Sequence, residues 1–125
     1  MGLQPVLADA LRLEQQKGRL NYYGIRHEGA AAFACSGFAK LSGRPAACLS
    51  IAGPGATNLA TGVGCAHLDR SALIAVTSEQ SNAMRTRVTQ MNVDHQALFR
   101  PITKWTTRAG ADSLSATVDQ ALSTA

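Results

Sequence analysis

Arg26-His27-Glu28-Gly29-Ala30-Ala31 and Gly53-Pro54-Gly55-Ala56-Thr57-Asn58 are the two stretches that decide the fold. In the first, a carboxylate stands where β-forming residues give way to a run of small, helix-forming residues. In the second, a Gly-Pro-Gly turn joins an apolar segment to another run of small residues. Two such junctions in succession are typical of a parallel sheet whose strands alternate with helices.

The rest of the chain continues this alternation. We expect strands over residues 21–26, 46–51, 72–77 and 102–107, helices over residues 3–18, 28–40, 56–67 and 113–122, and a polar loop over residues 78–94 followed by one helical turn at 95–99. The order predicts a single α/β domain over residues 1–125. Its architecture would be a three-layer, doubly wound or flavodoxin-like one, an open parallel sheet with helices on both faces.

The charge content narrows the classes of partner. Charged residues make up 16% of the chain, against about 25% in typical domains. This composition predicts that a partner covers part of the surface. The alternative is a monomer of modest solubility. The net charge of +4 is scattered and accompanies no nucleic-acid-binding motif, so we exclude nucleic acid and favour an anionic cofactor or substrate.

Cysteine usage and hydropathy indicate the compartment. The chain has an odd number of cysteines, Cys35, Cys48 and Cys65. All three lie in apolar segments, and no two of them form a CxxC pair. This pattern predicts buried small residues in a reducing compartment rather than disulfides or a metal site. The sequence shows no signal peptide and no apolar run of about 18 residues, so we expect a cytoplasmic protein that is not in a membrane.

Ligands of open parallel sheets bind beyond the carboxyl ends of the strands, where Glu28 and the Gly-Pro-Gly turn both fall. Glu28 is either a functional carboxylate or an ordinary acid favoured by the helix dipole. Gly53, Pro54 and Gly55 either admit a ligand close to the backbone or only turn the chain. The turn lacks the GxGxxG pattern of dinucleotide sites, and Asn58 is free to cap a helix or to bind a ring nitrogen.

The histidines do not predict a metal site. His27, His67 and His95 lack the spacing of metal ligands. His95 follows Asp94 and is either a proton carrier or part of a cap or surface pair.

Four stretches jointly resemble one family. In order they are RHEGAA (26–31), GFAKLSG (37–43), GPGATN (53–58) and PITKW (101–105). Their series is similar to the N-terminal, pyrimidine-binding domain of thiamine-diphosphate enzymes, in the group of acetolactate synthase, pyruvate oxidase and benzoylformate decarboxylase. The resemblance covers most of the chain, from about Gly2 to Ala125.

The resemblance implies roles for the residues already singled out. Glu28 would hydrogen-bond the aminopyrimidine ring of thiamine diphosphate and activate the cofactor for decarboxylation or acyl transfer on a 2-oxo acid, as a lyase or transferase does. Gly53, Pro54, Gly55 and Asn58 would line the cofactor site. Mg²⁺ and the diphosphate would be held by a separate domain or subunit, and the chain would form a homo-oligomer, such as a dimer.

Departures from the family pattern leave other functions open. Relatives usually begin with a strand and helix before the part that matches Gly2, and this front segment is expected to be missing. Residues 90–92 are Gln-Met-Asn where many relatives have Phe-Gln-Glu. Without a diphosphate domain the chain alone is expected to be inactive. The alternatives are a truncated, non-catalytic, self-associating fragment of the family and a flavodoxin-like nucleotide-binding module.

Overall fold

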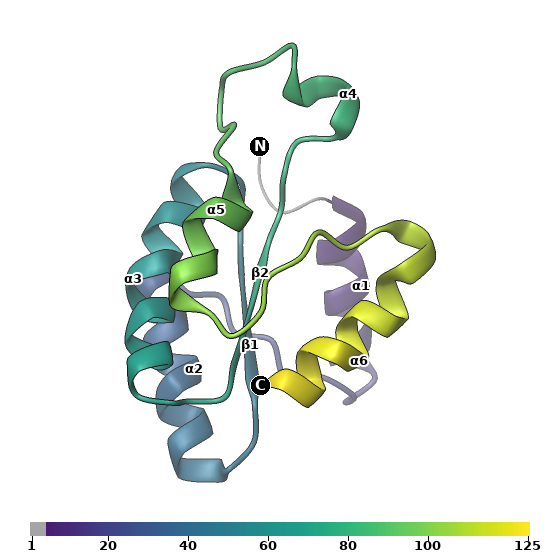
Figure 1. Ribbon diagram of the computed structural model, residues 1–125. Coiled ribbons are helices and arrows are strands. Elements are labelled where there is room, and N and C mark those ends of the chain that lie inside the picture. The colour runs from purple at the N-terminus through teal and green to yellow at the C-terminus, as the bar shows by residue number, and fades with distance from the viewer. Residues whose placement is uncertain (1–4) are drawn as a thin grey trace.

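The computed structural model describes residues 5–125 and shows an α/β arrangement around a small parallel sheet (Figure 1). The sheet consists of β1 (Ala46–Ser50) and β2 (Leu73–Thr77). Their register places Ala46 opposite Leu73 and Ser50 opposite Thr77. The two strands are parallel and are joined through a helix, so the predicted α/β class is confirmed.

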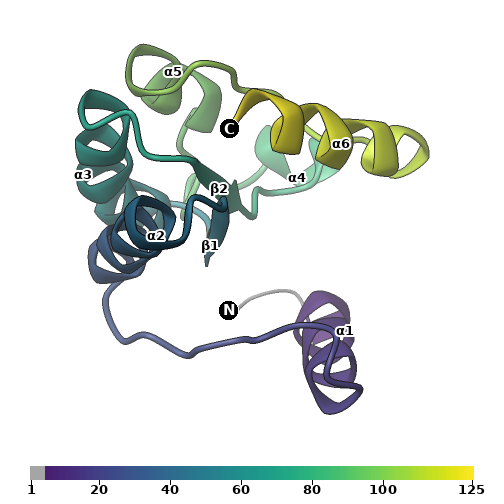
Figure 2. The same cartoon turned by 90° about the horizontal axis from the view of Figure 1, so that it is seen from below.

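Helices stand on both sides of this sheet. Helices α2 (Glu28–Ser42) and α3 (Pro54–Leu68) lie side by side on one side of the strands, whereas α1 (Pro5–Gln16) and α6 (Leu114–Thr124) lie on the opposite side (Figure 2). The core lies where α2, α3 and the strands meet, and it contains Ala32, Cys48, Ala56, Leu59, Val63 and Phe99. These are mostly small side chains, which allow the helices to approach closely.

Short helices connect the remaining segments. They are α4 (Asn82–Arg85), α5 (His95–Phe99), η1 (Arg100–Ile102) and η2 (Ala111–Ser113). The predicted turn at 95–99 is confirmed, and the predicted polar loop contains α4. The first helix is confirmed as α1, although its predicted start at Leu3 lies outside the described residues.

Two of the four predicted strands are wrong. Residues 21–26 form an exposed connection without ladder hydrogen bonds, in which Tyr23 keeps 77% of its surface exposed. β-Forming residues favour a strand only when one face of it is buried, and this connection has no buried face. Over residues 102–107 no strand forms: Ile102 ends η1, which contains Pro101, and Thr103 Oγ1 donates a hydrogen bond of 2.8 Å to the Phe99 carbonyl.

Helices α2 and α3 pack closely against each other at Gly62. A Cβ atom placed on Gly62 of α3 would lie 2.5 Å from Ala32 Cβ and 2.8 Å from the Gly29 carbonyl oxygen of α2. Both distances are shorter than a van der Waals contact, so the helix separation requires glycine at position 62. This separation also sets how near the first turns of the two helices come to one another.

Replacing Gly62 by alanine is therefore expected to destabilise the chain, by about 1–3 kcal/mol, because the added methyl group overpacks a helix crossing. Gly37→Ala is the matched control, since a Cβ on Gly37, which lies in α2, meets nothing within 4 Å. That control should gain about 0.5–1 kcal/mol through the helix propensity of alanine. Urea unfolding of both variants measures the two effects, and equal effects would contradict the close packing.

Candidate functional site

Glu28 occupies the first position of α2, at the carboxyl-end edge of the sheet. The helix begins there because His27 caps it: the Gly29 amide donates a hydrogen bond to His27 Nδ1 at 3.1 Å. The Glu28 side chain is half-buried. Its Oε2 accepts a hydrogen bond of 3.2 Å from Asn58 Nδ2, on the first turn of α3. Two candidate residues separated by 30 positions in the chain are thus brought into direct contact.

The Gly-Pro-Gly turn forms the wall beside this pair. Gly53 has φ 64° and ψ −118°, a conformation that disfavours a side chain, and a Cβ on it would lie 2.7 Å from Met91 Cα. A Cβ on Gly55 would lie 2.7 Å from Ile51 Cγ1 and 3.5 Å from Glu28 Oε1. Pro54 takes the first position of α3, where a helix needs no amide donor. The five candidate residues therefore form one contiguous arrangement.

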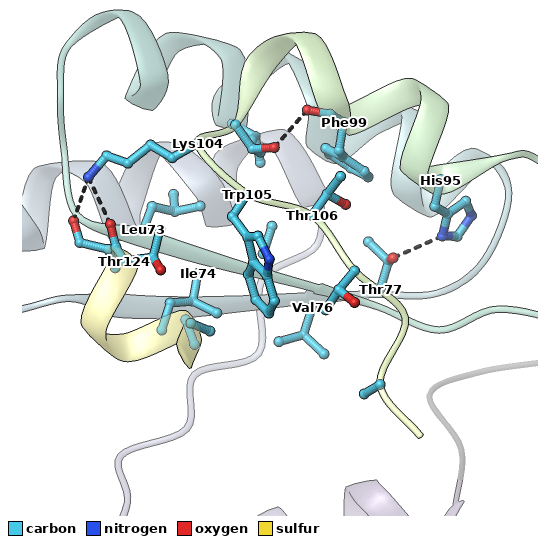
Figure 3. Close-up of a pocket in the computed structure, with 18 of the residues that line it drawn as sticks. Leu73, Ile74, Val76, Thr77, His95, Phe99, Lys104, Trp105, Thr106 and Thr124 are labelled. Atoms are coloured by element: carbon cyan, nitrogen blue, oxygen red, sulfur yellow. Dashed lines mark hydrogen bonds between the residues drawn. The ribbon is translucent and has the colours of Figure 1, made fainter. Parts of the chain in front are cut away.

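His95 fixes this turn from the other side. Its ring is buried, with 4% of the residue exposed. His95 Nε2 accepts a hydrogen bond of 3.4 Å from the Gly53 amide, and its Nδ1 lies 2.8 Å from Thr77 Oγ1 (Figure 3). Because Nε2 accepts, the proton is assigned to Nδ1, which donates to the threonine. His95 thus links the end of β2 to the turn, which sequence spacing alone could not indicate.

The sequence predicted that Asp94 and His95 either cap a helix or form a pair on the surface. The cap is confirmed for Asp94, whose Oδ1 accepts a hydrogen bond of 2.9 Å from the Ala97 amide. A surface pair is wrong for His95, because its ring is buried.

Sequence analysis missed an acidic side chain near the same edge. Glu79 follows β2, and its Oε2 lies 2.6 Å from Arg108 Nε, while its Oε1 lies 3.8 Å from His95 Nδ1. Arg85 lies 4.0 Å away from the same carboxylate. The ion pair with Arg108 connects the segment before α6 to the end of β2. The only sequence signal for it was the placement of Glu79 directly after a strand.

A cavity of about 1030 Å³ extends along β2, and Glu79 and His95 are among the residues that line it. Figure 3 shows His95 and Thr77 at one end, Trp105 beside the strand, and Lys104 at the other end. Lys104 Nζ donates hydrogen bonds to the carbonyls of Thr124 and Ala125, at 3.0 and 2.9 Å, and so is held by the end of α6. The apolar side chains of α6, such as Val118, form the opposite wall.

Burial governs the charge of His95. Loss of solvent lowers the pKa of His95 below its ordinary value of 6.5, although the negative charges of Glu79 and Asp94 act in the opposite direction. The positive charge of Arg85 lowers the pKa further. The ring is therefore neutral at neutral pH, as its acceptor role toward Gly53 requires.

A histidine with a lowered folded-state pKa binds a proton more readily in the unfolded chain. The contribution of His95 to the free energy of unfolding is therefore fully present above pH 6.5. It is lost as the pH is lowered through 6.5 toward the folded-state pKa. We expect urea unfolding to show this fall between about pH 7.5 and about pH 5.5, and His95→Gln to reduce it. His67→Gln, at an exposed position of α3, is the control and should leave the fall unchanged.

Among residues 5–125, no three His, Cys, Asp or Glu side chains gather as metal ligands would. Over the same residues, no helix has the length and apolar character needed to cross a membrane.

Similarity to known proteins accords with this geometry. Residues 4–98 match the family described as "Thiamine pyrophosphate enzyme, N-terminal TPP binding domain", pyrophosphate being another name for diphosphate. The chain is 46% identical over 79 residues to a probable acetolactate synthase large subunit of Methanocaldococcus jannaschii, covering 63% of this chain and 13% of that protein. It is 35% identical over 100 residues to an acetolactate synthase of Arthrospira platensis, covering 80% and 17%.

A third relative is the large subunit of acetolactate synthase isozyme 1 of Escherichia coli K12, which is 37% identical over 89 residues, 71% of this chain and 16% of that subunit. The chain thus spans less than a fifth of the length of these relatives. The family match covers the candidate residues Glu28, Gly53 and Asn58. The chain belongs to the thiamine pyrophosphate enzyme family and corresponds to the N-terminal, TPP-binding domain of that family.

Proposed function

We propose that this domain holds the aminopyrimidine ring of thiamine diphosphate, with Glu28 as the residue that bonds a ring nitrogen. The observation that carries the proposal is the contact between Glu28 and Asn58 beside the bare backbone of Gly55. Position 55 has no room for a side chain, and its glycine leaves the Glu28 carboxyl group beside buried backbone with no side chain between them. A flat heterocycle fits such a wall better than a bulky ligand.

The hydrogen bonds around Glu28 suit this role. Asn58 donates to Oε2, so a proton on the carboxyl group belongs on Oε1, which lies nearer Gly55. Among residues 5–125, no side chain donates a hydrogen bond to Oε1. A protonated Glu28 can therefore donate from Oε1 to a ring nitrogen while Asn58 holds the other oxygen in place. Asn58 is thus a positioning residue in this proposal.

When bound, thiamine diphosphate supplies the carbon nucleophile and electron sink for reactions of 2-oxo acids. This chain's residues would hold the ring, keep the Glu28 proton beside it and limit the access of water. Mg²⁺ and the diphosphate would be held by a separate domain or subunit, for which the much greater length of the relatives leaves room. A 2-oxo acid as substrate, a lyase or transferase reaction and a cytoplasmic location stay predictions.

A second candidate function, self-association, rests on the outer face of α2. Residues spaced by three or four positions share this face, and all are exposed and uncharged: Ala30, Phe33, Ala34, Gly37, Phe38 and Leu41. Phe33 and Phe38 each keep 48% of their surface exposed. An antiparallel two-fold pairing centred between Ala34 and Gly37 would place each Phe33 against Phe38 of the second copy. The face is therefore self-complementary, as a dimer contact requires.

The cofactor proposal is tested by calorimetric titration of thiamine diphosphate with Mg²⁺ into the chain, alone and with the diphosphate-binding domain of an acetolactate synthase. We expect tight binding only in the presence of that domain. Glu28→Ala should weaken it about tenfold or more, because a lost hydrogen bond to a buried partner costs about 1–3 kcal/mol. Glu14→Gln, in α1 and outside the candidate site, is the control and should leave the affinity unchanged.

Proton exchange at the reactive carbon of the bound cofactor, followed by NMR, gives an independent readout. Glu28→Gln keeps the size of the side chain but cannot hold the acidic proton, so exchange should be lost while circular dichroism stays the same. Unchanged exchange in this variant would sink the role of Glu28. Absence of binding under every condition would instead favour the non-catalytic fragment.

Self-association is tested separately by sedimentation. Phe38→Glu is expected to shift the chain from dimer to monomer, because it places a charge within an apolar contact. Tyr23→Glu is the matched control, since Tyr23 is also an exposed aromatic residue but lies outside α2. A monomeric unmodified chain would overturn this candidate.

A further inference from the structure

The buried ring of His95 lies between two alternative partners. On one side, Nε2 accepts the hydrogen bond of 3.4 Å from the Gly53 amide. On the other side, Nδ1 lies 2.8 Å from Thr77 Oγ1 (Figure 3) and 3.8 Å from Glu79 Oε1. A neutral ring can accept from the amide, whereas a cationic ring is attracted to the Glu79 carboxylate. The charge of this side chain therefore decides which of the two contacts is favoured.

We propose that His95 is a positioning residue whose protonation state controls how tightly the candidate site binds thiamine diphosphate. The neutral ring holds the Gly53 turn in the arrangement that admits the aminopyrimidine ring of the cofactor. A protonated ring carries N–H groups at both nitrogens, so its Nε2 and the Gly53 amide become two donors that face each other. The turn then loses its acceptor, and the affinity falls. This inference rests on the proposed function, because it concerns the ligand of the same site.

The turn connects His95 to Glu28 over a short distance. Gly53 and Gly55 are separated only by Pro54, whose ring restricts the backbone between them. A Cβ on Gly55 would lie 3.5 Å from Glu28 Oε1, the oxygen that would meet the ring nitrogen. On its other side the turn is closed, because a Cβ on Gly53 would lie 2.7 Å from Met91 Cα. A displacement of the Gly53 amide is therefore taken up on the side of Glu28.

Burial and the charges around His95 set the pH at which its ring takes up a proton. Burial lowers the pKa of His95, Glu79 after β2 and Asp94 at the start of α5 raise it, and Arg85 of α4 lowers it again. The turn before α3 contributes a backbone amide and no charge. Glu79 also pairs with Arg108 at 2.6 Å, which balances part of its negative charge. Because the net effect is a lowered pKa, the ring takes up a proton only as the pH falls below 6.5.

The cofactor and a proton on His95 therefore exclude each other. The bound form requires the neutral ring, so the affinity is complete above pH 6.5 and falls below the lowered folded-state pKa of His95. The fall reaches at most about tenfold per pH unit, because a single proton is involved. Below that pH, binding displaces the proton from His95, and formation of the complex releases about one proton to the buffer.

Calorimetric titration of thiamine diphosphate with Mg²⁺, in the presence of the diphosphate-binding domain of an acetolactate synthase, tests this coupling. Repeating it in buffers of different ionisation enthalpy, at neutral pH and below pH 6.5, gives the number of protons released. His95→Gln is the decisive variant, because its amide oxygen can replace the Nε2 acceptor but does not titrate. We expect proton release below pH 6.5 from the unmodified chain and from the exposed control His67→Gln, and a loss of this release in His95→Gln.

The outcomes separate this inference from the proposed function. Equal proton release in the unmodified chain and in His95→Gln overturns the inference and leaves the proposed function standing. Absence of binding at every pH overturns both. Titration of the cofactor itself affects both proteins equally and cancels in the comparison. At neutral pH, His95→Leu should bind about tenfold more weakly than His95→Gln, because the Gly53 amide then has no acceptor.

The ring nitrogens of His95 provide a readout that needs no cofactor. Nitrogen NMR of the purified chain at neutral pH should find the proton on Nδ1, which faces Thr77 and Glu79. As the pH is lowered, the signal of the Gly53 amide should shift with the same midpoint as the His95 ring, whereas the Gly37 amide, inside α2, should not follow it. A proton on Nε2 at neutral pH, or a Gly53 signal that does not follow His95, overturns the proposal.

Discussion

The contact between α2 and α3 is the constraint on which the site depends. Gly62 of α3 lies against Gly29 and Ala32 of α2, and no larger residue fits at position 62. Glu28 precedes Gly29 by one residue, and Asn58 precedes Gly62 by one helical turn. The helix separation that this glycine permits therefore sets the hydrogen bond of 3.2 Å from Asn58 Nδ2 to Glu28 Oε2. Packing in the core and geometry at the site are one property of this helix pair.

A second constraint holds the turn that faces the pair. Gly53 adopts a positive φ against Met91, and its amide donates to the buried ring of His95. A protonated ring would have no acceptor for that amide, so the turn depends on a neutral histidine. Burial keeps it neutral by lowering the pKa of His95, despite the negative charge of Glu79. Residues far apart in sequence thus stabilise one short loop.

The sequence predicted those features that depend on local signals. The helix that begins at Glu28, the turn at Gly53 and the apolar strands β1 and β2 each have strong patterns of their own. The strands expected at residues 21–26 and 102–107 failed because a strand also needs a neighbour and a buried face, which β-forming residues do not supply. The contacts of His95 and Glu79 were equally beyond prediction, because they depend on how distant segments meet.

A neighbour that buries the outer face of α2 would be coupled to the candidate site through this helix. A sheet of two strands is of marginal stability alone, so the packing of α2 and α3 must contribute most of the local free energy of folding. The outer face of α2 exposes Phe33, Phe38 and Leu41, of which Leu41 keeps 92% of its surface exposed. A neighbour that buries this face binds the folded helix and not the unfolded chain, and therefore stabilises it. Because the same helix carries Glu28, burial of its outer face would favour the arrangement in which Glu28 meets Asn58.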